Sequence, residues 1–205
     1  MNMKILPVLA ACIGMVTAAS CAQSSAPEEK ENQVIETIMA RRSIRQYKPV
    51  TVGRDTLNQI MTCGINAPSG LNKQSWEVRV VDDPVVMTEI CEKMAAGNPD
   101  ADPAMVRGCF RGAPVMVFIA NDPSYDCSPI DCGLLSENIM LSAWSLGVGS
   151  VCLGSPVRFL KNSPAALEKL GFSEGYEPII CIGLGYAAES PEAKPRDPSK
   201  YRFVE

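Results

Sequence analysis

The stretch VMVFIA at residues 115–120 decides the fold class, together with the stretch IDCGLLSENIMLSAWSL at residues 130–146. An uninterrupted apolar run of strand length is typical of a strand that is buried on both faces. The second stretch is apolar on almost every side of a helix, which predicts a helix buried in the core or in a subunit interface. Because helices and strands are mixed in this way along the chain, we predict the α+β class.

The other elements follow from the spacing of apolar residues. Apolar residues three and four positions apart predict helices, and short apolar runs predict strands. The predicted helices lie at residues 34–39, 57–65, 87–94 and 165–170, and the predicted strands at residues 76–81, 150–153 and 178–183. There is no internal repeat and no linker rich in proline or glycine, so we predict one domain from residue 33 to residue 205.

The composition narrows the class of protein. The chain has 205 residues, 46% of them hydrophobic, and its mean hydropathy of +0.04 is that of a globular protein. A net charge of −4 argues against a general nucleic-acid-binding protein. The chain contains no histidine, which excludes the usual serine-hydrolase triad and the Cys–His proteases. Without histidine or a CxxC motif, we expect no zinc site.

The first residues have the pattern of an export signal. The apolar run at residues 5–19 has the length of a signal-peptide core and is too short to span a bilayer comfortably. It ends in AASC at residues 18–21, which resembles a bacterial lipoprotein signal with Cys21 acylated; plain signal cleavage is the alternative. We expect a signal peptide at residues 1–20, a flexible tether at residues 21–32, and an exported protein, periplasmic or anchored to a bacterial membrane by lipid.

Seven cysteines follow Cys21, an odd number that leaves at least one unpaired within a monomer. Cys127 and Cys132 lie in a loop-like stretch and are the pair best suited to a disulfide. The cysteines in apolar periodic segments are expected to be small core residues. These are Cys63, Cys91, Cys152 and Cys181.

Two basic clusters stand far apart in the sequence, RRSIR at residues 41–45 and KPR at residues 194–196. Arginine can bind phosphate oxygens in a fork, and serine adds a directed donor. Together the clusters favour the phosphate of a nucleotide-like cofactor. The alternative for the first cluster is a solvated helix end, where cations offset the helix dipole.

The segment APSGLNKQSW at residues 67–76 suits the polar edge of a planar ring. Asn72 and Gln74 each carry a donor and an acceptor, and glycine lets backbone amides approach a ring closely. The alternative is a plain turn, because proline, serine, glycine and asparagine all favour turns. The GxG at residues 147–149 follows a helix instead of a strand, so we predict a helix end there and no dinucleotide fingerprint.

Four motifs in this order resemble the FMN-dependent nitroreductase family. They are Arg-Arg-Ser-x-Arg-x-Tyr from residue 41, Ala-Pro-Ser-Gly-x-Asn-x-Gln-x-Trp from residue 67, Leu-Gly-x-Gly-Ser from residue 146 and Lys-Pro-Arg from residue 194. The resemblance covers about residues 34–205. It implies a central, mostly antiparallel sheet flanked by helices. It also implies an intertwined homodimer in which each FMN site is built from both subunits and C-terminal segments, here residues 201–204, embrace the partner.

The resemblance also implies which residues bind FMN. The basic clusters would bind its phosphate and ribityl chain, the segment at 67–76 its isoalloxazine ring and ribityl chain, and a backbone amide its N5 atom. The implied residues are Arg41, Arg42, Ser43, Arg45, Lys194 and Arg196, then Ser69, Gly70, Asn72 and Gln74, then Leu153 and Gly154. Ser75 stands where the family often carries proline, and Glu77 adds negative charge; both departures concern substrate preference.

The implied activity is hydride transfer from NADH or NADPH through flavin N5 to a nitroaromatic, a quinone or a similar electron-poor acceptor. It needs no protein acid or base, so no catalytic side chain is expected. Reduced nicotinamides are normally absent outside the cytoplasm, however. An exported flavin-binding or redox-partner protein without NAD(P)H turnover is therefore the alternative, and a flavin-destroying enzyme of the same superfamily is a third candidate.

Overall fold

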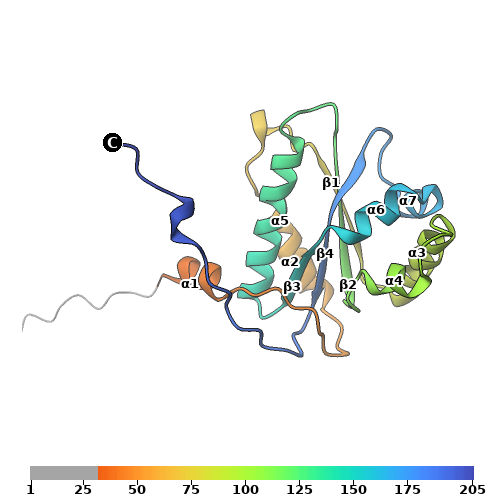
Figure 1. Cartoon of the computed structure of the whole chain (residues 1–205), viewed down its shortest axis with the longest axis horizontal. Coiled ribbons are helices and arrows are strands. Elements are labelled where there is room, and N and C mark those ends of the chain that lie inside the picture. Colours follow the sequence, from red (N-terminus) through yellow and green to blue (C-terminus); the bar gives the residue numbers. More distant parts are fainter. Residues whose placement is uncertain (1–31) are drawn as a thin grey trace, which may run out of the picture. The chain divides into compact units, whose positions relative to one another are not determined.

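Four strands form one sheet, and the computed structural model describes residues 32–205. The strands are β1 (Trp76–Val81), β2 (Val115–Asn121), β3 (Gly149–Leu153) and β4 (Glu177–Gly185). Their order is β1-β2-β4-β3, and each neighbouring pair is antiparallel (Figure 1). The predicted α+β class with an antiparallel sheet is confirmed. The predicted signal peptide, Cys21 and the tether up to residue 31 lie outside the described residues.

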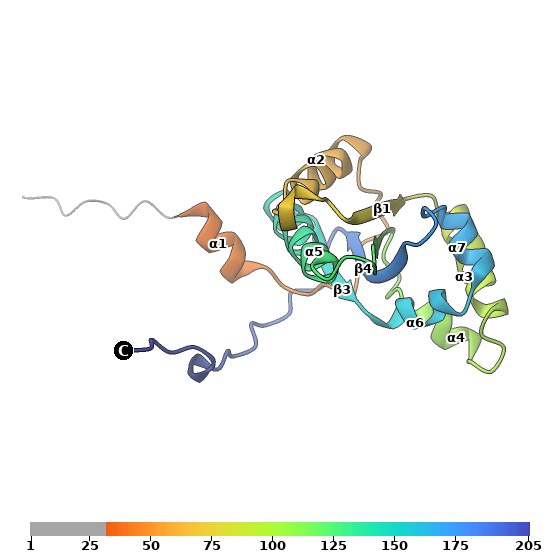
Figure 2. The same ribbon diagram turned by 90° about the horizontal axis from the view of Figure 1, so that it is seen from above.

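Helices cover both faces of the sheet (Figures 1 and 2). They are α1 (Gln33–Ala40), α2 (Arg54–Ile65), α3 (Pro84–Ala96), α4 (Pro103–Gly108), α5 (Ser128–Ser145), α6 (Ser155–Lys161) and α7 (Pro164–Leu170). On one face α2 and α5 pack against Val117 and Ile119, and on the other α3, α4, α6 and α7 pack against Met116 and Phe118. Successive residues of β2 thus enter different core clusters, which is why its apolar run is continuous.

The elements predicted from apolar spacing are all present, with ends that differ by a few residues. The helix α7 is predicted from its apolar spacing although it is as short as α6, but the short helices α4 and α6 are absent from the prediction. Both carry a proline in the first turn, and Asp102 caps α4, which are the start signals that could reveal them. Within residues 32–205, no helix has the length and apolar character needed to cross a membrane.

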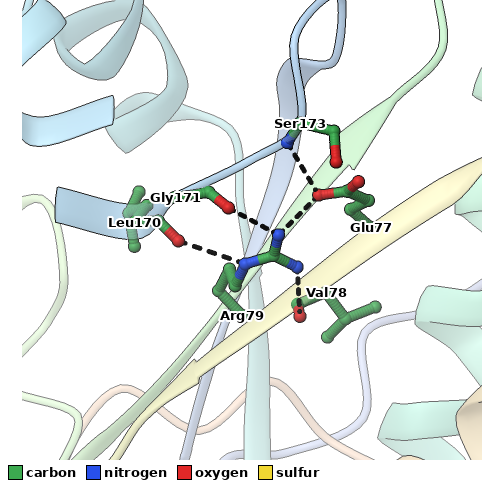
Figure 3. A network of polar contacts seen from close by, with 6 residues as sticks. All are labelled: Glu77, Val78, Arg79, Leu170, Gly171 and Ser173. Atoms are coloured by element: carbon green, nitrogen blue, oxygen red, sulfur yellow. Dashed lines mark hydrogen bonds and ion pairs between the residues drawn. The ribbon is translucent and has the colours of Figure 1, made fainter. Parts of the chain in front are cut away.

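A polar network ties α7 to β1 (Figure 3). The guanidinium of Arg79 donates to the carbonyl groups of Leu170 and Gly171, at 3.1 and 2.6 Å. Arg79 also pairs with Glu77 at 2.6 Å, and the Glu77 carboxylate accepts from the Ser173 amide at 3.1 Å. The last carbonyl groups of a helix have no partner within it, and a cation there is favourable. The network therefore fixes the end of α7 and the turn that leads to β4.

The cysteines differ from two expectations. All seven in the described residues are free thiols, so Cys127 and Cys132, the pair best suited to a disulfide, are not bridged. Cys127 precedes α5, whereas Cys132 lies inside the helix with its thiol directed to the Ala120 carbonyl at 3.8 Å. Burial raises the pKa of Cys132 to about 11.

Of the cysteines predicted in the core, Cys181 alone is fully buried. Cys63 is exposed on α2, Cys91 is half-buried on α3, and Cys152 is exposed on β3. A cysteine in an apolar segment is buried only if its own side of the helix or strand is covered. On β3 the neighbouring Val151 and Leu153 are buried, whereas Cys152 points to the opposite face of the strand and is exposed.

Candidate functional site

The two basic clusters line one cavity of about 440 Å³. Its basic and hydroxyl-bearing residues are Arg41, Arg42, Ser43 and Arg45 from the first cluster and Lys194 and Arg196 from the second. Ile38 and Met39, at the end of α1, add apolar wall, and Glu137 on α5 and Glu192 add two carboxylates. Five basic side chains against two acidic ones make the cavity suited to an anion.

Backbone pairing brings the two clusters together. The Ile44 amide donates to the Ser150 carbonyl on β3 at 2.9 Å. On the other side, the Ala188 amide donates to the Gln46 carbonyl at 2.9 Å. The segment after α1 therefore lies between the edge strand and the chain that leaves β4. Because that chain continues directly to the second cluster, two clusters distant in sequence reach the same cavity.

The arginines of this cavity keep donor groups for a ligand. Arg42 donates to two carbonyl groups at the end of α1, at 2.7 and 2.8 Å, so the predicted helix-end role is also present. Arg196 donates to the neighbouring Lys194 carbonyl at 3.2 Å. Arg41 Nε lies 3.5 Å from the Glu137 carboxylate, and it is buried without a hydrogen bond among the described residues. A buried donor without a hydrogen bond costs free energy, and a ligand atom that accepts from it removes that cost.

The loop at residues 69–75 lies toward the other end of α5 (Figure 1). Its Gly70 amide donates to Asp131, in the first turn of α5, at 3.0 Å. Arg41 instead approaches Glu137, in the middle of the helix. None of the described residues of the loop lines the basic cavity. Within one chain, the basic cavity and the loop, which are the two halves of the predicted site, therefore lie apart.

The loop has an unusual backbone. Three residues that are not glycine adopt left-handed conformations, namely Leu71 (φ 52°), Asn72 (φ 54°) and Gln74 (φ 49°). Such conformations crowd the Cβ atom and persist where surrounding contacts hold them. The Asn72 and Gln74 side chains are exposed, so their amide groups are available to a ligand.

Tyr125 packs against this loop from the segment before α5. A Cβ atom on Gly70 would collide with the Tyr125 hydroxyl, so any larger residue there would have to displace the Tyr125 side chain. The Lys73 ammonium lies 4.0 Å from the centre of the Tyr125 ring, a cation–π contact. A hydrogen bond with Cys127 raises the pKa of Tyr125. Lys73 is thus a cation within the loop that lies against Tyr125, and sequence reasoning misses this contact because its partner is distant in the chain.

The end of β3 is the third predicted contact. The Leu153 side chain is buried in the core, and Gly154 is exposed as the residue that precedes α6. No described atom lies within 4 Å of where a Cβ on Gly154 would be. The backbone at this point is open to approach, and it lies outside the basic cavity.

Comparison with known proteins decides the family. The sequence profile of the nitroreductase family matches residues 38–186. The chain belongs to the nitroreductase family. A nitroreductase of Desulfitobacterium hafniense, solved with bound FMN, is 32% identical with a TM-score of 0.75, covering 85% of this chain and 99% of that one. A second FMN-bound nitroreductase, from Bacteroides fragilis, is 31% identical with a TM-score of 0.74, covering 85% and 100%.

A curated relative adds a named activity. The NADPH-flavin oxidoreductase of Vibrio harveyi is 30% identical over 184 residues, covering 82% of this chain and 71% of its own length.

The structure shows the contacts of Ser75 and Glu77, the two positions at which the resemblance implied a departure from the nitroreductase family. Ser75 is buried and donates its hydroxyl to Asp131 at 3.2 Å. Glu77 belongs to the network of Figure 3. Burial opposes the ionisation of Glu77, but hydrogen bonds from Ser173 and the charge of Arg79 outweigh it, so its pKa is lowered. The Glu77 charge is therefore paired and is not a free charge beside the site.

Asp131 is the residue of this region that sequence reasoning misses. It falls within the apolar stretch at 130–146 and therefore reads as part of a core helix. In the structure it is buried, and its two oxygens accept from the Gly70 amide and the Ser75 hydroxyl. A carboxylate in an otherwise apolar helix is the signal that could have marked it, because buried charges are almost always partnered.

Proposed function

We propose that this protein is an FMN-dependent oxidoreductase that passes hydride from NADH or NADPH to a nitroaromatic, a quinone or a similar electron-poor acceptor. The observation that carries the proposal is the cavity in which both basic clusters meet. The FMN bound in the D. hafniense and B. fragilis relatives supports the cofactor. The name of the V. harveyi relative supports the reaction.

The residues of the cavity fit the FMN phosphate. A phosphate dianion offsets the excess of positive charge, and arginine binds two of its oxygens at once. Arg41 Nε is a buried donor that a phosphate oxygen can satisfy. Lys194 and Arg196 lie on an exposed segment, so their long side chains can adjust to the anion.

Bound FMN supplies the atom that accepts and donates hydride, N5 of its ring. The residues of the chain would bind the FMN and orient it. In this proposal the basic cavity binds the phosphate, the Asn72 and Gln74 amides meet the polar edge of the ring, and the open backbone at Gly154 lies near N5. A chain without histidine suits a reaction that needs no protein acid or base.

We infer that two copies of the chain complete each site. The loop lines no part of the basic cavity, so a single chain offers two separate halves. Two apolar surfaces suited to a partner extend from the same side of the sheet as the first cluster (Figures 1 and 2). Their residues are exposed by 50–88%: Val34, Ile35, Ile38 and Met39 on α1, and Tyr201, Phe203 and Val204 at the C-terminal end. Contiguous exposed apolar side chains are typical of interaction surfaces.

The test is an absorbance spectrum of the purified protein before and after addition of NADH or NADPH, with nucleotide oxidation followed in the presence of a nitroaromatic. We expect a yellow protein whose flavin absorbance is bleached by the nucleotide, and a dimer by light scattering. Colourless protein that does not take up added FMN contradicts the proposal. FMN binding with negligible turnover supports the exported flavin-binding protein instead.

We also propose that the chain is exported and acylated at Cys21. The support is the apolar run at residues 5–19 followed by AASC. Labelling of the full chain with a radioactive fatty acid in a bacterial host tests this. We expect the label and membrane association to be lost in Cys21→Ala, with the protein recovered in the periplasm. An unlabelled wild type found in the periplasm indicates plain signal cleavage, and one found in the cytoplasm contradicts export.

A further inference from the structure

The loop at residues 69–75 cannot owe its shape to its own sequence alone. Leu71, Asn72 and Gln74 adopt left-handed backbone conformations, and of these residue types asparagine alone tolerates them readily. A free chain of this sequence would leave that conformation. Some contact outside the loop must therefore hold it.

Asp131 makes that contact at both ends of the loop. Its Oδ1 accepts from the Gly70 amide at 3.0 Å, and its Oδ2 accepts from the Ser75 hydroxyl at 3.2 Å. The three strained residues lie between these two points. Asp131 is 2% exposed and Ser75 4%, so water competes little for either bond. The carboxylate therefore closes the loop into a ring.

Bonds inside the loop and at its base complete the arrangement. The Ser69 hydroxyl accepts a hydrogen bond from the backbone amide of Gln74 at 3.1 Å. The Ser128 hydroxyl, in the first turn of α5, donates to the Ser75 carbonyl. The first bond joins the two ends of the loop from within it, and the second fixes its last residue to α5. Asp131 is the side chain outside the loop that bonds to both of its ends, and it ties them to the longest helix.

We propose that Asp131 is a positioning residue for the flavin site, and that Ser75 is its partner. By closing the loop, the Asp131 carboxylate holds Asn72 and Gln74 in the one arrangement in which their amide groups meet the ring of FMN. The inference rests on the proposed function, because it assigns a purpose to the shape of the loop. Directional hydrogen bonds need such fixing, since they weaken steeply when the donor angle departs from linear.

The variants separate the two bonds. Asp131→Ala removes both of them. Asp131→Asn keeps a side chain of the same shape, whose carbonyl accepts from Gly70 and whose NH₂ donates to the Ser75 oxygen, so it should rescue the loop. Ser75→Ala removes one bond and little volume. Ser163→Ala is the matched control, because Ser163 is an equally buried serine whose hydroxyl donates to backbone carbonyls on the other face of the sheet.

Two quantities are measured, the FMN dissociation constant of each apo-protein and the hydrogen exchange of the Gly70 amide without FMN. We expect FMN to bind about tenfold more weakly in Asp131→Ala and about three- to fivefold more weakly in Ser75→Ala, with faster Gly70 exchange in both. Asp131→Asn should stay within about threefold of the wild type, and Ser163→Ala within about twofold, whatever its cost in stability.

The outcomes distinguish the inference from the function it rests on. A wild type that binds no FMN overturns the proposed function itself. If the wild type binds FMN, and Ser75→Ala and Ser163→Ala bind it with equal affinity, the positioning role is overturned. Faster Gly70 exchange in Ser75→Ala with unchanged affinity overturns it as well, because the loop is then held for stability alone. If Asp131→Ala fails to fold, Ser75→Ala decides.

Discussion

The basic cavity and the loop at residues 69–75 are built in opposite ways. Long charged side chains from two distant segments form the cavity, and few of them bond to one another. The loop presents uncharged amides at Asn72 and Gln74 with a single cation, Lys73, and is held in a strained shape by a buried carboxylate. Attraction between charges falls off slowly with distance, whereas a hydrogen bond to a ring edge depends on angle. We therefore expect the cavity mainly to attract the cofactor and the loop mainly to align it.

The largest effect is expected at the cavity. The double variant Lys194→Ala, Arg196→Ala should bind FMN about 100-fold more weakly, because each lost charge-assisted bond contributes about 1.5–3 kcal/mol. The remaining affinity should depend less on salt. Fluorescence titration of the apo-protein with FMN, repeated at two salt concentrations, measures both.

Lys200→Ala is the control for this variant. Lys200 lies on the same C-terminal segment, pairs with Asp197 at 3.8 Å and lines no part of the cavity. Its FMN affinity should equal that of the wild type. A double variant that loses less than about threefold would show that the phosphate is bound elsewhere.

The network around Arg79 offers a region that serves neither half of the site. Arg79→Ala leaves the carbonyl groups at the end of α7 and the Glu77 carboxylate without their partner. We expect a loss of about 2 kcal/mol in the free energy of unfolding. FMN affinity should not change. Urea denaturation of the apo-protein and FMN titration measure the two effects.

Lys93→Ala is the comparison for Arg79→Ala. Its exposed pair with Glu89, at 3.8 Å along one helix, should contribute less than about 0.5 kcal/mol. Weaker FMN binding in Arg79→Ala would contradict the separation of this network from the site.

The fold was largely predictable because its signals are local. The apolar period places each long helix and strand, and Gly147, with φ 74°, ends α5 before β3 as the GxG segment predicts. Trp76 likewise begins β1, where the predicted strand at residues 76–81 starts, and it is buried. The six-residue helix α4 shows no apolar period. Whether Cys63 is exposed depends on which side of α2 packs against the rest of the fold.

The residue types of the site were predictable from the sequence, but the way in which distant segments meet to form it was not. Residues 41–45 and 194–196 meet through backbone pairing beside Ser150, which no pattern within either segment encodes. Asp131 escaped notice for the same reason, because its partners lie in a loop about 60 residues earlier in the chain. The separation of the loop from the cavity follows from the length of α5, which holds one near its first turn and the other near its middle.

Mixing two defective variants tests whether cavity and loop come from different chains. We pair the cavity variant Lys194→Ala, Arg196→Ala with the loop variant Asn72→Ala, Gln74→Ala by co-expression under two tags. In a mixed dimer built as proposed, one site carries both defects and the other neither. Random pairing then restores about one quarter of the sites to full affinity.

The measurement is FMN content and NAD(P)H oxidation after purification through both tags, where about half of the sites should be intact. Each variant purified alone is the control. A mixture with no more FMN than its parents would show that cavity and loop of the same chain form the site, or that the site needs one of them only.

The smallest effect concerns the charge of Glu77. Its pKa is lowered in the folded protein, so its contribution to stability is present above the ordinary value of 4.5 and is lost as the pH falls through the lowered value. Glu77→Gln should therefore be less stable than the wild type near neutral pH, by less than about 1 kcal/mol, and equal to it in strong acid. Thermal unfolding across this pH range measures the difference.

Glu174→Gln is the control, because Glu174 is exposed in the same turn as Ser173. It should follow the wild type at every pH. FMN affinity at neutral pH should be the same in both variants, since the Glu77 carboxylate faces Arg79 and Ser173. Weaker FMN binding in Glu77→Gln alone would mean that the Glu77–Arg79 network on β1 also helps to align the flavin, and alignment would then not belong to the loop alone.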